Sequence, residues 1–210
     1  MTDNAKLLEI VERLRRVSAT LDNIAAMASD LANSAPPDWA FPVGGAEYPV
    51  NLWYAASFHT WSKRNPDGHT GLDLNVQVGG RGGIDEGQPV YAIADGVVEQ
   101  VGNSAGWLGV VILHIEDVGG VPLYVRYAHL NAKTIPVSAG QYVIAGSTLG
   151  YLGDYRNAAG HKAAHLHLDA ALNHFAWNVY RAPEIAWVDP LPILKAHLDP
   201  ALVDLMVSEA

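Results

Sequence analysis

The stretch GVVILHIEDVGGVPLYVRYAHL, residues 109–130, decides the fold, because two β-forming runs flank a short glycine turn. The runs at 109–116 and 121–130 are rich in β-branched and aromatic residues, which favour strands. Similar runs, separated by segments that contain Gly, Pro, Asn or Asp, lie at 89–101, 141–153 and 164–172. This spacing predicts a mainly β domain of antiparallel strands, a β-sandwich or barrel-like fold, rather than βαβ units.

The two ends of the chain differ from this glycine-rich middle. All 20 glycines lie between Gly44 and Gly160. From Leu7 to Leu31 the apolar residues alternate spacings of three and four, which predicts a long amphipathic, coiled-coil-like N-terminal α-helix over residues 4–33. We interpret this helix as an interaction element, and homo-oligomerisation and docking on another surface stay open as alternatives.

The predicted domain map has four parts. Residues 1–35 contain the N-terminal helix, 36–60 form a linker and lead-in segment, 61–195 form the β domain and 196–210 form a C-terminal tail. The run ILKAHL at 193–198 predicts a short C-terminal helix that follows the turn residues Asp189 and Pro190.

Composition excludes several classes of function. The 13 Lys and Arg residues against 22 Asp and Glu give a net charge of −9, so we expect no nucleic-acid partner. There is no cysteine, so disulfides, thiolate nucleophiles and cysteine zinc sites are excluded, and any metal must be held by His and carboxylate. We expect no membrane span, because there is no apolar run of about 18 residues. We also expect no Sec signal peptide, because charged residues interrupt the apolar positions of the N-terminus.

Two short motifs place metal-binding side chains close together. In His69-Thr70-Gly71-Leu72-Asp73, an extended backbone after a bend at Gly71 would bury Leu72 and turn Asp73 towards His69. In HLHLD at 165–169, the strand period of two places His165 and His167 on one face. Three nitrogen or oxygen donors plus a water are the composition of a catalytic zinc centre, and zinc would acidify that water and polarise a carbonyl. Imidazole ligands predict that metal binding weakens below about pH 6.

At this point the sequence resembles the lysostaphin-type zinc endopeptidases, whose domain is also called the LytM domain. The resemblance runs from about Gly68 to Leu194, with the matching stretches in the family order. These stretches are GHTGLDL, GQPVYAIADGVVEQVG, GVVILHIED, YVRYAHLN, VSAGQYVIAGSTLGYLG, AHLHLD and DPLPIL.

The resemblance implies a role for each matching site residue. It makes His69, Asp73 and His167 the ligands of one zinc ion per chain, and His129 and His165 the catalytic pair. Which histidine acts as the base and which stabilises the oxyanion stays open. The implied activity is a metalloendopeptidase that hydrolyses peptide bonds in peptidoglycan cross-links of the bacterial cell wall.

The same sequence suggests two other functions for such a scaffold. A LytM-fold regulatory module that binds metal without hydrolysis, and controls another cell-wall hydrolase, stays open as the alternative. A biotinyl or lipoyl carrier domain is excluded, because no lysine lies between Arg81 and Lys133 to carry the cofactor. Without a signal peptide, we expect the protein to reach the wall after lysis, by injection or on a phage-like particle.

The sequence does not determine the role of several features near the expected groove. The glycine-rich insert between Asp73 and Gly87 predicts a mobile loop near the site, and the segment from Trp39 to Trp61 could cover the groove. His161 is interpreted as an exposed loop residue. The remaining histidines are treated as structural, and the aromatics Trp61, Trp107, Tyr151 and Trp177 as core residues that could also flank the groove. The bond that is cut cannot be read from the sequence.

Overall fold

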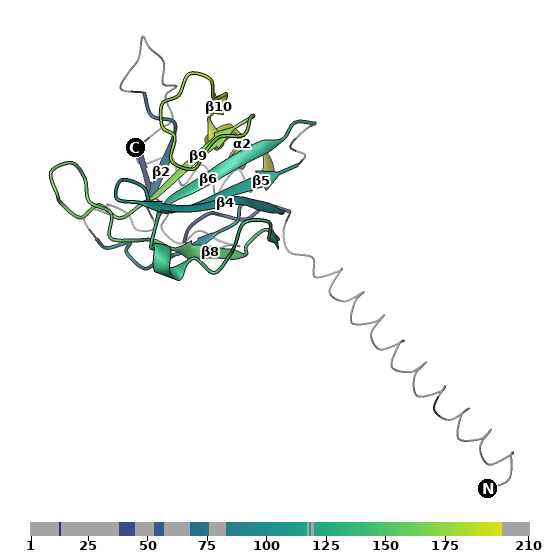
Figure 1. Cartoon of the computed structure of the whole chain (residues 1–210), viewed down its shortest axis with the longest axis horizontal. Helices are drawn as coiled ribbons and strands as arrows, with labels where there is room; N and C mark the ends of the chain where they lie inside the picture. The colour runs from purple at the N-terminus through teal and green to yellow at the C-terminus, as the bar shows by residue number, and fades with distance from the viewer. Residues whose placement is uncertain are drawn as a thin grey trace, which may run out of the picture. The chain divides into compact units, whose positions relative to one another are not determined.

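A computed structural model describes residue 13 and residues 38–44, 53–56, 68–75, 83–116, 118 and 120–198 (Figure 1). The chain divides into two units, residues 1–36 and 37–210. The helix predicted over 4–33 therefore lies outside the described residues, except for residue 13. Within the described part of the chain, no helix is both long enough and apolar enough to cross a membrane.

The second unit is built on an antiparallel sheet of eight strands. Its strand order is β1-β2-β9-β6-β5-β4-β7, and β10 pairs with β9. The strands are β1 (Trp53–Ala56), β2 (Gly71–Asn75), β4 (Gly96–Ser104), β5 (Leu108–Ile115), β6 (Leu123–Leu130), β7 (Tyr142–Val143), β9 (Leu166–Ala171) and β10 (Trp187–Val188).

A second sheet and two short helices complete the described elements. Strands β3 (Pro89–Tyr91) and β8 (Thr148–Tyr151) pair with each other. The 3-10 helix η1 covers Ala132–Thr134, and helix α2 covers Pro190–His197. The mainly β, antiparallel prediction is confirmed, whereas the described strands do not close into a barrel, because β1 and β7 are free edges of the large sheet.

The central strands β5 and β6 are buried on both faces. On one face Leu113 and Val125 join a large core that also contains Val90 of β3 and Leu149 of β8. On the other face Ile112 joins a smaller cluster to which residues 172–187 contribute side chains such as Phe175 and Trp187. Burial on both faces explains why the run at 109–116 is almost continuously apolar instead of alternating with polar residues.

Residues 38–44, assigned to the linker by sequence, belong to the core. Trp39, Phe41 and Val43 are buried, and β-bridges join Trp39 to Ala94 and Val43 to Val90. Strand β1, further along the same predicted linker, pairs with β2. The parts of the segment 39–61 that the structure describes thus extend the β domain, whereas residues 45–52 and 57–61 lie outside the described residues.

The predicted C-terminal helix is confirmed as α2, although it begins earlier than predicted. The side chain of Asp189 accepts a hydrogen bond of 3.0 Å from the backbone N–H of Leu191 and caps the helix. Pro190 occupies the first helical position, where a missing N–H costs nothing. Leu194 is fully buried in the main core, so the helix closes one end of the domain.

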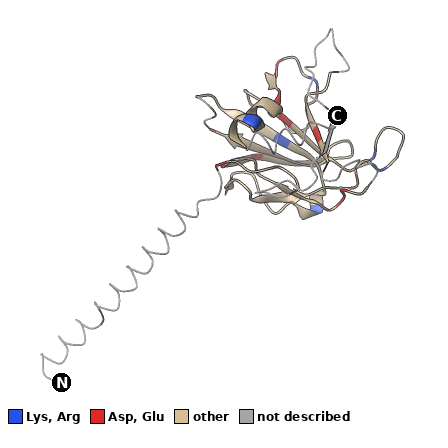
Figure 2. Ribbon diagram, turned by 180° about the vertical axis from the view of Figure 1, so that it is seen from behind, with Lys and Arg blue, Asp and Glu red and all other residues tan. Residues whose placement is uncertain are grey.

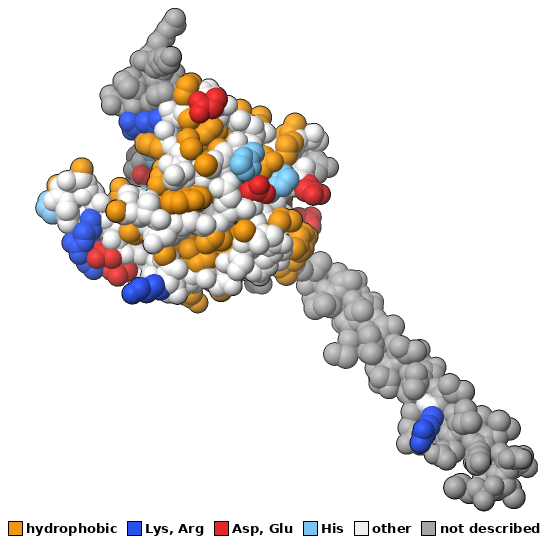
Figure 3. All heavy atoms as spheres, in the orientation of Figure 1, with side chains coloured by type: hydrophobic (Ala, Val, Ile, Leu, Met, Phe, Trp, Pro, Cys, Tyr) orange, Lys and Arg blue, Asp and Glu red, His pale blue; other side chains and the backbone are white. Residues whose placement is uncertain are grey.

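Charged side chains are sparse and dispersed. Among the described residues, Figure 2 shows Lys and Arg at several separate places along the ribbon. The face in Figure 3 is mostly uncharged, with acidic and basic groups towards its edges.

Candidate metal centre

Strands β2 and β9 bring the two motifs together. They pair antiparallel, and Asp73 lies directly opposite His167. Leu72 and Leu74 of β2 and Leu166 and Leu168 of β9 are fully buried in the core. As the strand period predicts, the polar residues between these leucines point to the other face, which leads to an open cavity.

Gly71 allows this close pairing of the strands. A Cβ on Gly71 would lie 2.3 Å from the backbone oxygen of Leu168 and 2.6 Å from the Cβ of Asp169. The glycine is therefore needed because another backbone approaches it, rather than for the bend that the sequence suggested. Any side chain at this position would push β9 and its two histidines away from β2.

Three donor atoms converge at the end of these strands. His69 Nε2 lies 3.1 Å from His167 Nδ1 and 3.2 Å from Asp73 Oδ1, and the last two atoms are 2.9 Å apart. Zinc bonds of about 2.0–2.2 Å in a tetrahedral arrangement separate neighbouring ligand atoms by about 3.3–3.6 Å. The donor types and their spacing therefore fit a small divalent ion after slight outward movement.

His167 is buried between two carboxylates. Its Nδ1 lies 2.9 Å from Asp73 Oδ1, and its Nε2 lies 2.8 Å from Asp169 Oδ2. Burial opposes the imidazolium, but the hydrogen bonds and charges of Asp169 and Asp73 outweigh burial and raise the pKa of His167 to about 9. Burial alone would raise the pKa of Asp73, but hydrogen bonds with His165, His167 and His69 hold that pKa well below its ordinary value. A proton therefore occupies the site when no metal does.

His165 lies beside the donor set with a defined tautomer. Its Nδ1 is 2.6 Å from the backbone oxygen of Ala163, and because a carbonyl only accepts, Nδ1 carries the proton. Its Nε2 is 3.5 Å from Asp73 Oδ1. With Nδ1 engaged by the carbonyl of Ala163, Nε2 is the ring nitrogen that faces Asp73 and the cavity.

His129 reaches the same place from β6, which is the other neighbour of β9. Its ring centroid is 4.7 Å from that of His165, and its backbone adopts a left-handed φ of 66°. Its Nδ1 is buried without a hydrogen-bond partner among the described residues. Burial, reinforced by the charges of His165 and His167, holds the pKa of His129 well below its ordinary value, so the imidazole is neutral. Strained backbone and an unpaired buried nitrogen are features that cluster at functional sites.

All five residues singled out by sequence line one cavity of about 340 Å³. Trp107, Gly106 and two tyrosines, Tyr155 and Tyr180, complete its wall. The Tyr155 ring lies 3.9 Å from that of His129, and the Tyr180 ring lies 5.3 Å from that of Trp107. Neither tyrosine was predicted from the sequence, because both come from loops whose path no periodicity predicts.

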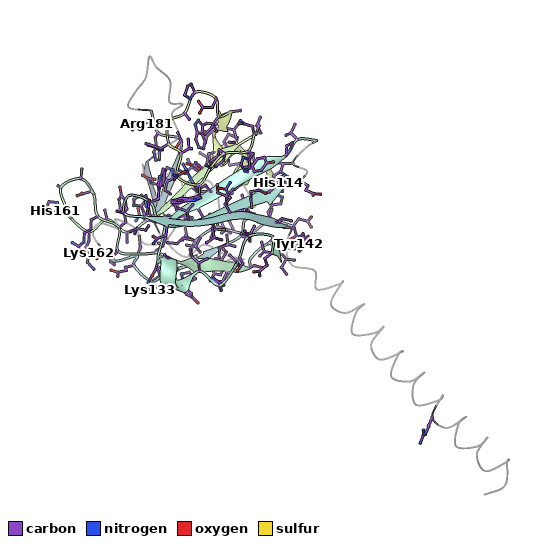
Figure 4. All side chains as sticks on the ribbon, viewed as in Figure 1. His114, Lys133, Tyr142, His161, Lys162 and Arg181 are labelled. Atoms are coloured by element: carbon purple, nitrogen blue, oxygen red, sulfur yellow. The ribbon has the colours of Figure 1, made fainter. Side chains whose placement is uncertain are left out.

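Other side chains with an open role lie elsewhere. His161 is exposed next to Lys162 on a loop that projects from the domain (Figure 4). His114 stacks on Tyr124 with ring centroids 4.5 Å apart, as expected of a structural residue. Among the four aromatics considered for the groove, Trp107 lines the cavity, Tyr151 and Trp177 do not, and Trp61 lies outside the described residues. His59 and residues 76–82 of the glycine-rich insert are outside them as well.

Comparison with known proteins identifies similar domains. The family model "Peptidase family M23" matches residues 67–178. The antimicrobial peptidase lysostaphin from Staphylococcus simulans is similar with a TM-score of 0.52 and 27% identity, over 75% of this chain and 56% of that one. The solution structure of lysostaphin is similar with a TM-score of 0.50 and 25% identity, over 73% of this chain and 56% of that one. This chain thus matches little more than half the length of these relatives, and a comparison with curated proteins gives no match.

Proposed function

The chain belongs to peptidase family M23, and we propose that it is a zinc-dependent endopeptidase that hydrolyses peptide bonds in the cross-links of bacterial peptidoglycan. The observation that carries this proposal is the cavity in which a His-Asp-His donor set and two further imidazoles meet. The similarity to lysostaphin, described as an antimicrobial peptidase, supports the choice of a cell-wall substrate.

In this proposal His69, Asp73 and His167 hold one zinc ion through Nε2, Oδ1 and Nδ1. The set leaves a coordination position open, as catalytic zinc centres do. Bound zinc supplies Lewis-acid chemistry, because it polarises a carbonyl oxygen and lowers the pKa of a water. The buried leucines behind the three ligands hold both strands rigid, so the donors stay in place through turnover.

His165 is proposed as the general base. Its Nδ1–H is engaged by the oxygen of Ala163, so only Nε2 can receive a proton from the cavity. The ring cannot rotate to offer the other nitrogen without losing that 2.6 Å hydrogen bond. The same Nε2 can then return the proton to the departing amine of the cleaved peptide.

His129 is proposed as the donor that stabilises the oxyanion. Because its pKa is well below the ordinary value, the imidazole is neutral and carries a single N–H. A neutral, pre-positioned donor stabilises developing negative charge without competing for the proton that His165 takes. The left-handed backbone at His129 is held by hydrogen bonds of its N–H to Trp107 and of its oxygen to Gly153.

The test is digestion of isolated sacculi of several wall chemistries by the purified protein, with added zinc and with chelator. Mass spectrometry of the released fragments would reveal new amino termini and name the bond. We expect cleavage that chelator abolishes and that His69→Ala eliminates. His161→Ala is the matched control, because it removes an exposed imidazole outside the cavity. If protein shown to carry zinc released no fragment from any wall, the proposed hydrolysis would be wrong and a regulatory metal-binding module would be favoured.

A further inference from the structure

We propose that Arg126 and Asp169 are positioning residues that fix the tautomer and ring orientation of His167, so that its Nδ1 faces the metal. The inference rests on the zinc site proposed above and assigns a role to a buried ion pair outside the donor set. Neither residue lines the cavity, and both side chains are fully buried.

Three contacts support the inference, and the first is between Asp169 and the proposed metal ligand His167. Asp169 Oδ2 lies 2.8 Å from His167 Nε2. An ionised carboxylate can only accept, so the proton stays on Nε2, and the lone pair of Nδ1 is left for the metal. The same hydrogen bond holds the plane of the ring against rotation.

The second contact is between Asp169 and Arg126. Arg126 Nε lies 3.1 Å from Asp169 Oδ1, and Arg126 Nη2 donates to Asp169 Oδ2, so the guanidinium grips both oxygens. The hydroxyl of Thr70 donates to Oδ2 as well, at 3.2 Å. These donors orient the carboxylate, and the guanidinium balances its buried charge.

The third contact joins Arg126 to the cavity wall. Its Nη1 donates to the backbone oxygens of Trp177 and Val179, at 3.1 and 2.5 Å, in the loop that also carries the wall residue Tyr180. The guanidinium carbon lies 4.0 Å from the ring centroid of Trp107, another wall residue. Arg126 thus contacts Asp169, which bonds to the proposed ligand His167, and it also contacts the loop at 177–179 and the indole of Trp107 in the cavity wall.

Stability is a weak explanation for such a pair. Desolvation of two charges offsets much of their attraction, and well-packed apolar residues often serve a fold equally well. The planar guanidinium of Arg126, which contacts one carboxylate and two carbonyls, is instead suited to holding these groups in fixed positions. The pair lies directly behind His167, between the two strands that carry His129 and His167.

The test compares Asp169→Asn and Arg126→Lys with Leu113→Ala. The amide introduced by Asp169→Asn would offer one acceptor oxygen for the donors of both Arg126 and His167, and lysine cannot donate to both carboxylate oxygens as the guanidinium does. Each variant therefore disturbs one contact in the series from Arg126 through Asp169 to His167. Leu113 is fully buried in the main core and does not line the cavity, so its truncation lowers stability without touching His167.

The primary readout is zinc affinity measured by competition with a chromogenic chelator, set beside the thermal midpoint of the metal-free protein. We expect Asp169→Asn to weaken zinc binding about 10–100-fold, and Arg126→Lys to weaken it in the same direction. Leu113→Ala should lower the thermal midpoint and leave zinc affinity unchanged. Equal zinc affinity in wild type and Asp169→Asn, or equal weakening in all three variants, would overturn the proposal.

A second readout reports the tautomer directly. In zinc-loaded wild type labelled with ¹⁵N-histidine, we expect a hydrogen-bonded Nε2–H resonance of His167 that is protected from exchange. The protection should be lost in Asp169→Asn and kept in Leu113→Ala. If Asp169→Asn fails to fold, Thr70→Val, which removes only the third donor to the carboxylate, should still reduce the protection, and unchanged protection there would overturn the proposal. Wild type that binds no zinc would refute the proposed function instead, so the two failures are distinguishable.

Discussion

The geometry of the site predicts that a proton and zinc compete for His167, and this competition sets how zinc affinity depends on pH. The two carboxylates that flank His167 raise its pKa to about 9, so the metal-free protein holds an imidazolium between Asp73 and Asp169 at neutral pH. Zinc requires the neutral ring, and its binding must expel that proton. Raising the pH from 7 to 9 is therefore the perturbation that isolates this residue.

The magnitude follows from the pKa of about 9. At pH 7 about one molecule in 100 has an unprotonated His167, so zinc affinity should rise about tenfold per pH unit and level off above about pH 9. Ordinary imidazole ligands would place that limit near pH 6 to 7. Stability of the metal-free protein should change in the opposite sense. The pKa of His167 in the folded protein exceeds its unfolded value of about 6.5, so protonated His167 stabilises the fold by on the order of 3 kcal/mol. This stabilisation is complete below about pH 6.5 and is lost as pH rises through about 9.

Isothermal titration calorimetry at pH 7 and pH 9 tests this, with chelator-buffered zinc and buffers of differing ionisation enthalpy. We expect release of about one proton per zinc at pH 7 that can be attributed to His167, and less above pH 9. His161→Ala, which removes an exposed imidazole, should leave the profile unchanged. Constant affinity from pH 7 to 9 without proton release would show that His167 is neutral before the metal arrives, and would refute the reasoning.

Three further predictions concern single side chains. His129→Ala should retain zinc and lose about 10²-fold or more in hydrolysis rate, measured as released amino termini, since it removes a donor to the oxyanion and no ligand; full activity would remove His129 from the mechanism. Gly71→Ala should destabilise the fold and weaken zinc binding in denaturant and chelator titrations, because its Cβ would lie 2.3 Å from the oxygen of Leu168, whereas Gly106→Ala, with open space around the new methyl, should unfold like wild type. Leu166→Ala should cost about 2–5 kcal/mol of unfolding free energy, because a fully buried side chain is truncated; a loss under about 1 kcal/mol would mean that the leucine between the two histidines does not anchor β9.

Part of the site was predictable because it depends on local periodicity. In HLHLD at 165–169 the alternation of a strand puts both histidines on the face opposite the buried leucines, wherever that strand lies in the sheet. The run at 109–116 and the run ILKAHL at 193–198 are equally local signals: strand β5 forms at the first, and helix α2 forms at the second but begins earlier, at Pro190. The resemblance to a known family then grouped five residues that physical reasoning could only treat motif by motif.

Other features required the folded chain. Asp169 is the last residue of the HLHLD motif, and the strand period of two places it on the same face as His167. Nothing in the spacing indicates that Arg126, which lies 43 positions earlier, donates to its carboxylate. Residues 38–44 lie in the segment that the sequence assigned to a linker and lead-in, but three of their apolar side chains fill the core. Tyr155 and Tyr180 reach the cavity along loops, where backbone path and not periodicity sets direction.

The sequence by itself determined the class of the fold, the strands that carry the motifs and the side chains able to bind a metal, since these depend on residue type and on a period of two. The tertiary structure decided which of those side chains meet, because pairing of β2 and β6 with β9 joins residues about 40 to 100 positions apart in the chain. It also decided their protonation. The pKa of His167 rises and that of His129 falls because one ring is buried between carboxylates and the other beside imidazoles, and that difference exists only once the strands have paired.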